Sequence, residues 1–246
     1  MAQWYSHGLW ILWISALLTF ISLWFIQAPY GRHQRTGWGP SLSGRWGWFW
    51  MELPSVALFT GILLTGYPLS LNQCLMGFLW LLHYVHRTFI FPLKLVNPSP
   101  MPISIIGMGF TFNVLNSFLN AYWITFLSPL THLNTPLMVI GMIIFFAGFY
   151  INKKSDAVLH ALRRHNPKKY IIPQGFLHNY IASPNYLGEI LEWIGFACVT
   201  QSQPAIGFAA YTIANLVPRA YGHWRWYQRT FPRYPENRRI LIPKVW

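Results

Sequence analysis

Long apolar runs separated by short polar joints dominate the chain. A helix needs about 20 mostly apolar residues to cross the hydrocarbon core of a bilayer. Seven such runs occur, at about 8–28, 47–68, 73–93, 102–124, 137–152, 177–199 and 204–222. The pattern predicts an all-α, polytopic membrane protein with seven transmembrane helices. The fifth run is short, so its helix is expected to continue beyond the membrane.

Basic residues are confined to alternate joints of this pattern. All 18 Lys and Arg residues lie in or beside the first, third and fifth joints and the C-terminal tail. Because such residues favour the cytoplasmic side of a membrane, the N-terminus is predicted outside and the C-terminus in the cytoplasm. The N-terminal run lacks a basic leader and a clear cleavage site, so we interpret it as a retained span.

Composition supports the membrane class. Only 9% of the residues are charged, against about 25% in a typical soluble domain. The net charge of +13 follows from the basic joints, and no nucleic-acid partner is expected. Cys74 and Cys198 stand in apolar stretches without nearby ligand residues, so both are interpreted as buried thiols and no metal site is expected. Residues 1–246 are expected to form one membrane-embedded domain.

Charged side chains interrupt the second and third runs. Glu52 lies in an apolar segment, where a carboxylate is costly unless it faces a cavity or a partner. Pro54 loosens the helix beside it. In "LHYVHRTF", one helical turn carries Tyr84 and Arg87 together with two imidazoles, His83 and His86. We interpret both segments as the walls of a polar chamber; the alternatives are a structural ion pair for Glu52 and an outward-reaching side chain for Arg87.

Three C-terminal segments each place polar or aromatic residues along one helical face. Carboxylates in an apolar helix need basic or hydroxyl partners, and the neighbouring stripes supply them. Such stripes around a common centre would suit the hydroxyls, phosphates and amide of a dinucleotide, although no Rossmann glycine motif is present. A solvated juxtamembrane helix is the alternative for the first stripe alone. The stripes are Asn152, Asp156 and Arg163; Asn185, Glu189 and Trp193; and Arg219, His223 and Tyr227.

Several long motifs resemble those of the steroid 5-alpha-reductases. They include "ELPS", "HYVHRTF", "NKKSDAVLHALR", "IPQGFLHNYIASPNYLGEILEWIG" and "RAYGHWRWYQRTFPRYPENRRILIP", in the family's order. The resemblance runs from about residue 30 to the C-terminus and is densest over 150–244. It implies a seven-helix membrane enzyme that uses NADPH to reduce the 4,5 double bond of a 3-oxo-Δ4 steroid, with a pocket that opens toward lipid.

The resemblance also implies roles for individual residues. Glu52 and Tyr84 match the pair that hydrogen-bonds the steroid 3-oxo oxygen, so they are the expected catalytic residues. The sequence departs from the family at Met51, His160 and Ile171. Residues 1–125 are expected to form mainly the substrate pocket and residues 137–246 mainly the cofactor site. Positions tied to NADPH binding are Arg87, Asn152, Asp156, Arg163, Tyr170, Asn185, Glu189, Arg219, His223 and Tyr227.

The expected reaction is hydride transfer to C5 while Tyr84 and Glu52 polarise the 3-oxo group. Other enone lipids are possible substrates, and a monomer in a bacterial inner membrane or the endoplasmic reticulum is expected, with the cofactor site facing the cytoplasm. The basic, glycine-rich joint at 29–47 is expected to fold over the cofactor. The alternatives are a membrane methyltransferase of the isoprenylcysteine or phospholipid type and a non-catalytic sterol or lipid binder.

Overall fold

Seven long helices run side by side in the computed structural model, which describes residues 3–128, 134–167 and 169–246. They are α1 (Gln3–Phe25), α2 (Gly44–Leu64), α3 (Leu71–Val85), α5 (Ile103–Tyr122), α6 (Thr135–His165), α7 (Pro184–Thr200) and α8 (Gln203–Thr230). The shorter elements are η1 (Gly31–His33), β1 (Ser41–Leu42), η2 (His86–Ile90), α4 (Phe91–Lys94), β2 (Met101–Pro102), η3 (Trp123–Leu127) and η4 (Phe176–Asn179). The predicted all-α class is therefore confirmed, apart from the two-residue β1–β2 ribbon.

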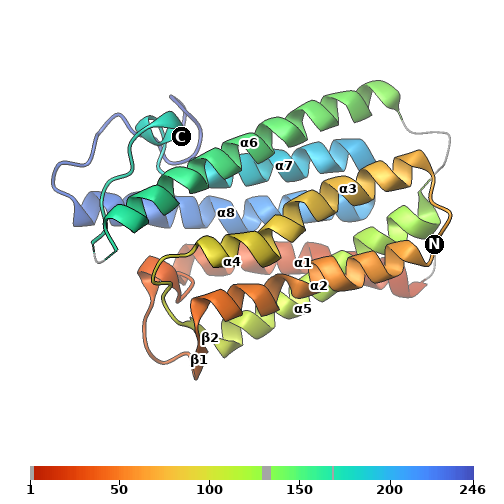
Figure 1. Cartoon of the computed structure of the whole chain (residues 1–246), viewed down its shortest axis with the longest axis horizontal. Helices are drawn as coiled ribbons and strands as arrows, with labels where there is room; N and C mark the ends of the chain where they lie inside the picture. The colour runs from red at the N-terminus through yellow and green to blue at the C-terminus, as the bar shows by residue number, and fades with distance from the viewer. Residues whose placement is uncertain (1–2, 129–133, 168) are drawn as a thin grey trace.

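The long helices pack in pairs along the bundle (Figure 1). Helix α6 lies against α7, α2 against α5, and α1 against α8, while α7 also contacts α8. Fully buried aromatic side chains join the pairs, and the rings of Phe59 and Trp80 stack with centroids 4.7 Å apart. Helix α1 begins at the end of the bundle opposite to the one that holds the C-terminus (Figure 1).

Within the described residues, five helical segments are long and apolar enough to span a membrane. They are Gln3–Phe25, Gly44–Leu64, Leu71–Lys94, Ile103–Leu127 and Thr135–His165. The fifth run is helical to His165, as its short apolar length led us to expect. Helix α7 has 17 residues, and α8 is less apolar, so spans at these two helices stay predictions. The sixth run becomes regular helix only at Pro184, because η4 and a turn precede it.

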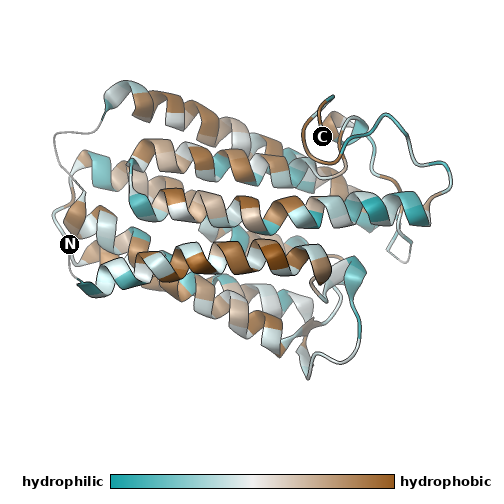
Figure 2. Cartoon of the chain, turned by 180° about the vertical axis from the view of Figure 1, so that it is seen from behind, coloured by the Kyte–Doolittle hydropathy of each residue, from teal (hydrophilic) through white to brown (hydrophobic). Residues whose placement is uncertain are grey.

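Polar and apolar residues are distributed along the bundle in the way a membrane protein requires. Hydrophilic residues gather at the end that holds the C-terminus, in the second half of α8 and the following tail (Figure 2). Many large apolar side chains face outward, including Phe25 at 83% and Trp10 at 67% exposed. Cys74 is exposed and Cys198 half-buried, and both are free. The predicted burial of Cys74 was wrong because an apolar run can face lipid as readily as protein.

Helices α6 and α7 cross closely at two pairs of glycines. A Cβ atom built on Gly148 would lie 2.6 Å from the Gly188 carbonyl oxygen, and one on Gly188 would lie 2.7 Å from the Gly148 oxygen. Gly141 and Gly195 face each other in the same way, at 2.7 and 2.6 Å. Small residues let helix backbones approach in membranes. The crossing brings the polar stripes of α6 and α7 together.

The helix formed by the third apolar run contains one wider turn, and this turn carries Arg87. The Phe91 N–H donates to the His86 carbonyl, five residues back, which defines η2 as a π turn. Pro92 follows this turn and has no backbone N–H to donate to the next helical hydrogen bond. Such π turns are frequent at functional sites.

Candidate active site

Two cavities meet inside the bundle. The first, called the Glu52 cavity, has a volume of about 130 Å³ and is lined by residues of α2, α3, α5, α7 and α8. The second, called the Arg163 cavity, has a volume of about 260 Å³ and is lined by the first joint, α6, α7 and α8. Tyr30, Trp48, Arg87 and Arg219 line both. The two cavities therefore share a wall, and each half of the chain contributes to both.

Glu52 is held by two partners at the edge of its cavity. The residue is 8% exposed. Arg87 Nε lies 3.5 Å from Glu52 Oε1, and Asn113 Nδ2 donates to Glu52 Oε2 at 3.1 Å. The Arg87 guanidinium packs on the Trp48 ring, 4.3 Å from its centroid. The ion pair considered from the sequence is present, and Arg87 turns inward rather than toward the surface.

Tyr84 lines the same cavity as Glu52 and rests on a packed aromatic wall. The residue is 3% exposed, and its ring centroid lies 4.8 Å from that of Trp80 and 5.5 Å from that of Trp193. Trp193 is itself 1% exposed, so this member of the predicted stripe belongs to the core behind Tyr84. Next to Tyr84, His83 Nδ1 lies 2.7 Å from Glu192 Oε1. This packing fixes the direction of the Tyr84 side chain.

Glu189 lines the Glu52 cavity, whereas five of the predicted residues on α6, α7 and α8 line the Arg163 cavity. Arg163 lies over the Tyr170 ring, 3.9 Å from its centroid. Arg219 lies over the Tyr30 ring at 5.0 Å. The predicted residues that line the Arg163 cavity are Arg87, Asp156, Arg163, Tyr170, Asn185, Arg219 and His223. The Arg163 cavity is therefore lined by several guanidinium groups together with a carboxylate and an amide.

The first joint closes one side of the Arg163 cavity. The His33 ring stacks on that of His223 with centroids 5.6 Å apart, and the Arg32 guanidinium lies 4.8 Å from the Tyr227 ring centroid. Burial, reinforced by the charges of Arg32 and Arg219, lowers the pKa of His33 to about 4. Within the described structure, Arg32 Nη1 and His33 Nε2 are buried without a hydrogen-bond partner. The joint therefore presents unpaired polar atoms beside the cavity.

Two of the predicted cofactor residues line neither cavity and instead support those that do. Asn152 Nδ2 donates to the Asn185 carbonyl at 2.9 Å and so ties α6 to α7. Tyr227 stacks on Tyr234, with centroids 5.4 Å apart, beneath Arg32. The structure thus brings most of the predicted site residues to one place and puts these two behind them.

Among the residues that line the two cavities, Asn113, Tyr30 and Trp48 were missed from the sequence. Asn113 is an amide inside an apolar run, and the argument applied to Glu52 could have found it. Tyr30 and Trp48 gave no such signal, because aromatic residues near a membrane surface commonly anchor the protein there. In the described part of the chain, no group of three or more His, Cys, Asp or Glu side chains could hold a metal ion.

Comparison with known proteins identifies the family. Residues 99–246 match the family described as 3-oxo-5-alpha-steroid 4-dehydrogenase. The chain belongs to this family. It is 40% identical to steroid 5-alpha-reductase DET2 of Arabidopsis thaliana over 239 residues, which cover 93% of this chain and 91% of that one. It is 37% identical to 3-oxo-5-alpha-steroid 4-dehydrogenase 2 of Sus scrofa, with 94% and 93% covered.

The human 3-oxo-5-alpha-steroid 4-dehydrogenase 2 is 38% identical, over 88% of this chain and 87% of its own. The resemblance noted in the motifs is thus confirmed over nearly the whole length. Together with the five apolar helical segments, the family makes this protein a multi-pass membrane oxidoreductase.

Proposed function

We propose that the protein reduces the 4,5 double bond of 3-oxo-Δ4 steroids with NADPH as the reductant. The observation that carries this proposal is the shared wall between the two cavities. Glu52 and Tyr84 lie in one buried cavity, and Arg87 and Arg219 join it to a second, cation-rich cavity. A carbonyl compound and a phosphorylated dinucleotide could then meet across that wall.

The groups around the Arg163 cavity fit a phosphorylated dinucleotide. Arginine side chains bind phosphates with paired N–H groups, and Asp156 and the Asn185 amide suit ribose hydroxyls. The unpaired Arg32 Nη1 and His33 Nε2 would find partners on such a ligand. Bound NADPH supplies the hydride. The residues proposed to bind or support it are Arg87, Asn152, Asp156, Arg163, Tyr170, Asn185, Glu189, Arg219, His223 and Tyr227.

Tyr84 and Glu52 are the proposed catalytic residues. Negative charge develops on the 3-oxo oxygen as C5 gains hydride, and a proton at C4 completes the reduction. The Tyr84 hydroxyl would donate to that oxygen, and Glu52, held by Arg87 and Asn113, would orient the donor. A preorganised donor in a water-excluded site stabilises developing charge strongly.

The topology predicted from the charge pattern belongs to the same proposal. All seven long helices would cross the membrane, with the N-terminus outside and the C-terminus and cofactor entrance in the cytoplasm. The chain would act as a monomer, with substrate held mainly by residues 1–125 and NADPH mainly by 137–246. The packing of α7 and α8 against the apolar helices supports this arrangement.

A tyrosine substitution tests the proposal. Tyr84→Phe should lower turnover by about 10²-fold, as loss of one oxyanion donor does elsewhere, while NADPH binding persists. The assay follows NADPH oxidation with a 3-oxo-Δ4 steroid, and Tyr180→Phe, at a residue 57% exposed, is the matched control. A Tyr84→Phe protein with a normal rate would remove Tyr84 from the mechanism. Steroid-independent methyl transfer from S-adenosylmethionine would favour the methyltransferase alternative.

A further inference from the structure

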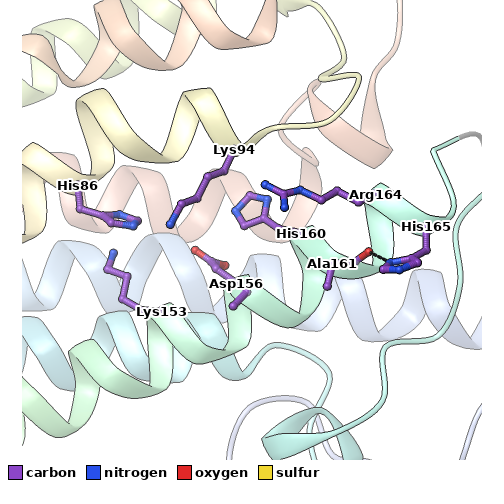
Figure 3. A pocket seen from close by; sticks show the side chains of 9 residues that line it. His86, Lys94, Lys153, Asp156, His160, Ala161, Arg164 and His165 are labelled. Atoms are coloured by element: carbon purple, nitrogen blue, oxygen red, sulfur yellow. Dashed lines mark hydrogen bonds between the residues drawn. The ribbon is translucent and has the colours of Figure 1, made fainter.

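A third cavity lies between η2, α4 and α6. This cavity, called the Lys94 cavity, has a volume of about 290 Å³. Lys94 enters it from α4 and His86 from η2, while Lys153, Asp156 and Arg164 face it from α6 (Figure 3). Of these residues, only Asp156 also lines the Arg163 cavity. The proposed reaction does not involve Lys94, His86, Lys153 or Arg164.

The cavity carries positive charge that the protein does not neutralise. Three basic side chains, those of Lys94, Lys153 and Arg164, line the cavity with one carboxylate, that of Asp156. Across the part of the chain that the structure describes, Asp156 forms no ion pair within 4.0 Å. His86 Nδ1 is buried there with no hydrogen-bond partner. Concentrated cations in a recess attract an anion that can accept several hydrogen bonds, and a phosphate group does both.

The elements that form the cavity also carry exposed apolar side chains. Leu93 is 76% exposed beside Lys94, and Ile90 is 41% exposed in η2. On α6, Tyr150 is 57% and Phe146 44% exposed. All three elements belong to helical segments apolar enough to span a membrane, η2 and α4 to Leu71–Lys94 and α6 to Thr135–His165. The recess therefore lies where the lipid-facing surface gives way to the basic end of the bundle, the place where basic pockets between helices bind lipid head groups.

We propose that the Lys94 cavity binds the phosphate group of an anionic membrane lipid. The head group would lie between Lys94, Lys153 and Arg164, and the acyl chains would cover the exposed apolar residues of α4 and α6. A lipid fits better than a free anion because only a lipid uses both the charge and the apolar surface. This inference depends on the membrane location and not on the proposed reaction.

Lipid retention by charge-matched variants tests the inference. Full-length protein is mixed with phosphatidylglycerol or phosphatidylcholine in detergent, and bound lipid is counted by native mass spectrometry. Lys94→Gln/Arg164→Gln should weaken phosphatidylglycerol binding by about 10-fold or more, since each basic residue contributes to anionic-lipid affinity. Lys154→Gln/Arg233→Gln removes the same charge from exposed residues outside the cavity and should leave binding unchanged. Equal losses in both double variants would overturn the proposal.

Two further measurements separate the possible sources of phosphate. Millimolar inorganic phosphate should not displace phosphatidylglycerol, and complete displacement would mean a site for small free anions. A Lys94→Gln/Arg164→Gln protein that keeps its lipid but loses NADPH affinity would assign the cavity to the dinucleotide. Ala161→Phe fills the recess without changing its charge and should also reduce lipid retention. If this variant folds and keeps its lipid, the assignment to the cavity is wrong.

Discussion

Replacing Gly148 with alanine should push α6 away from α7. The added Cβ would lie 2.6 Å from the Gly188 carbonyl oxygen, and it would also meet the backbone nitrogen of Glu192. Ordinary Cβ contacts begin at 3.4 Å, so the backbones must separate by at least about 0.8 Å at this point. Both neighbours are backbone atoms, so no side chain can move aside. Overpacking of this kind typically costs about 1–3 kcal/mol of stability.

The same change should disturb the proposed cofactor site. Asn152 lies one turn beyond Gly148 and donates to the Asn185 carbonyl at 2.9 Å. A shift of about 1 Å in a positioning group can cost up to about 10²-fold in rate. We therefore expect Gly148→Ala to lower the melting temperature in detergent and to raise the KM for NADPH by about 10-fold.

The matched control for this experiment is Gly107→Ala in α5. A Cβ at Gly107 meets nothing within 4 Å. Alanine is the better helix former by about 0.5–1 kcal/mol, so this variant should be as stable as the parent or slightly more so. If Gly148→Ala matches Gly107→Ala in melting temperature and KM, the glycine crossing does not set the spacing of the site.

Three other predictions concern the cofactor, the orientation and the pH dependence. Asp156→Ala should raise the KM for NADPH and leave steroid affinity intact; the reverse pattern in a binding assay would contradict the assignment. NADPH outside sealed vesicles that expose the basic end should support reduction and protect Arg32 from trypsin, and activity driven only from the opposite face would reverse the orientation. Burial lowers the pKa of His178 to about 4 from its usual 6.5, so the unfolded chain binds the proton more readily and stability should fall as pH drops from about 6.5 toward 4. The melting temperature of His178→Gln should depend less on pH over that window, and an unchanged slope would refute this.

The hydropathy pattern predicted the helices because bilayer thickness imposes one length on every span. It drew attention to Glu52 and Arg87 because a charge inside an apolar run needs a partner or a cavity. In the structure the two side chains form an ion pair with each other. The pattern could not separate protein-facing from lipid-facing apolar residues, which is why the burial of Cys74 was wrong. Nor could it assign Trp48, whose role as a platform under Arg87 depends on a contact between distant segments.

The wall common to the two cavities has a thermodynamic consequence. Arg87 and Arg219 border both cavities, and Arg87 also forms an ion pair with Glu52. A ligand in one cavity that draws either guanidinium toward itself reduces the positive charge that lines the other cavity. Occupants of the two cavities should therefore bind cooperatively or anticooperatively. By linkage, each changes the dissociation constant of the other by the same factor.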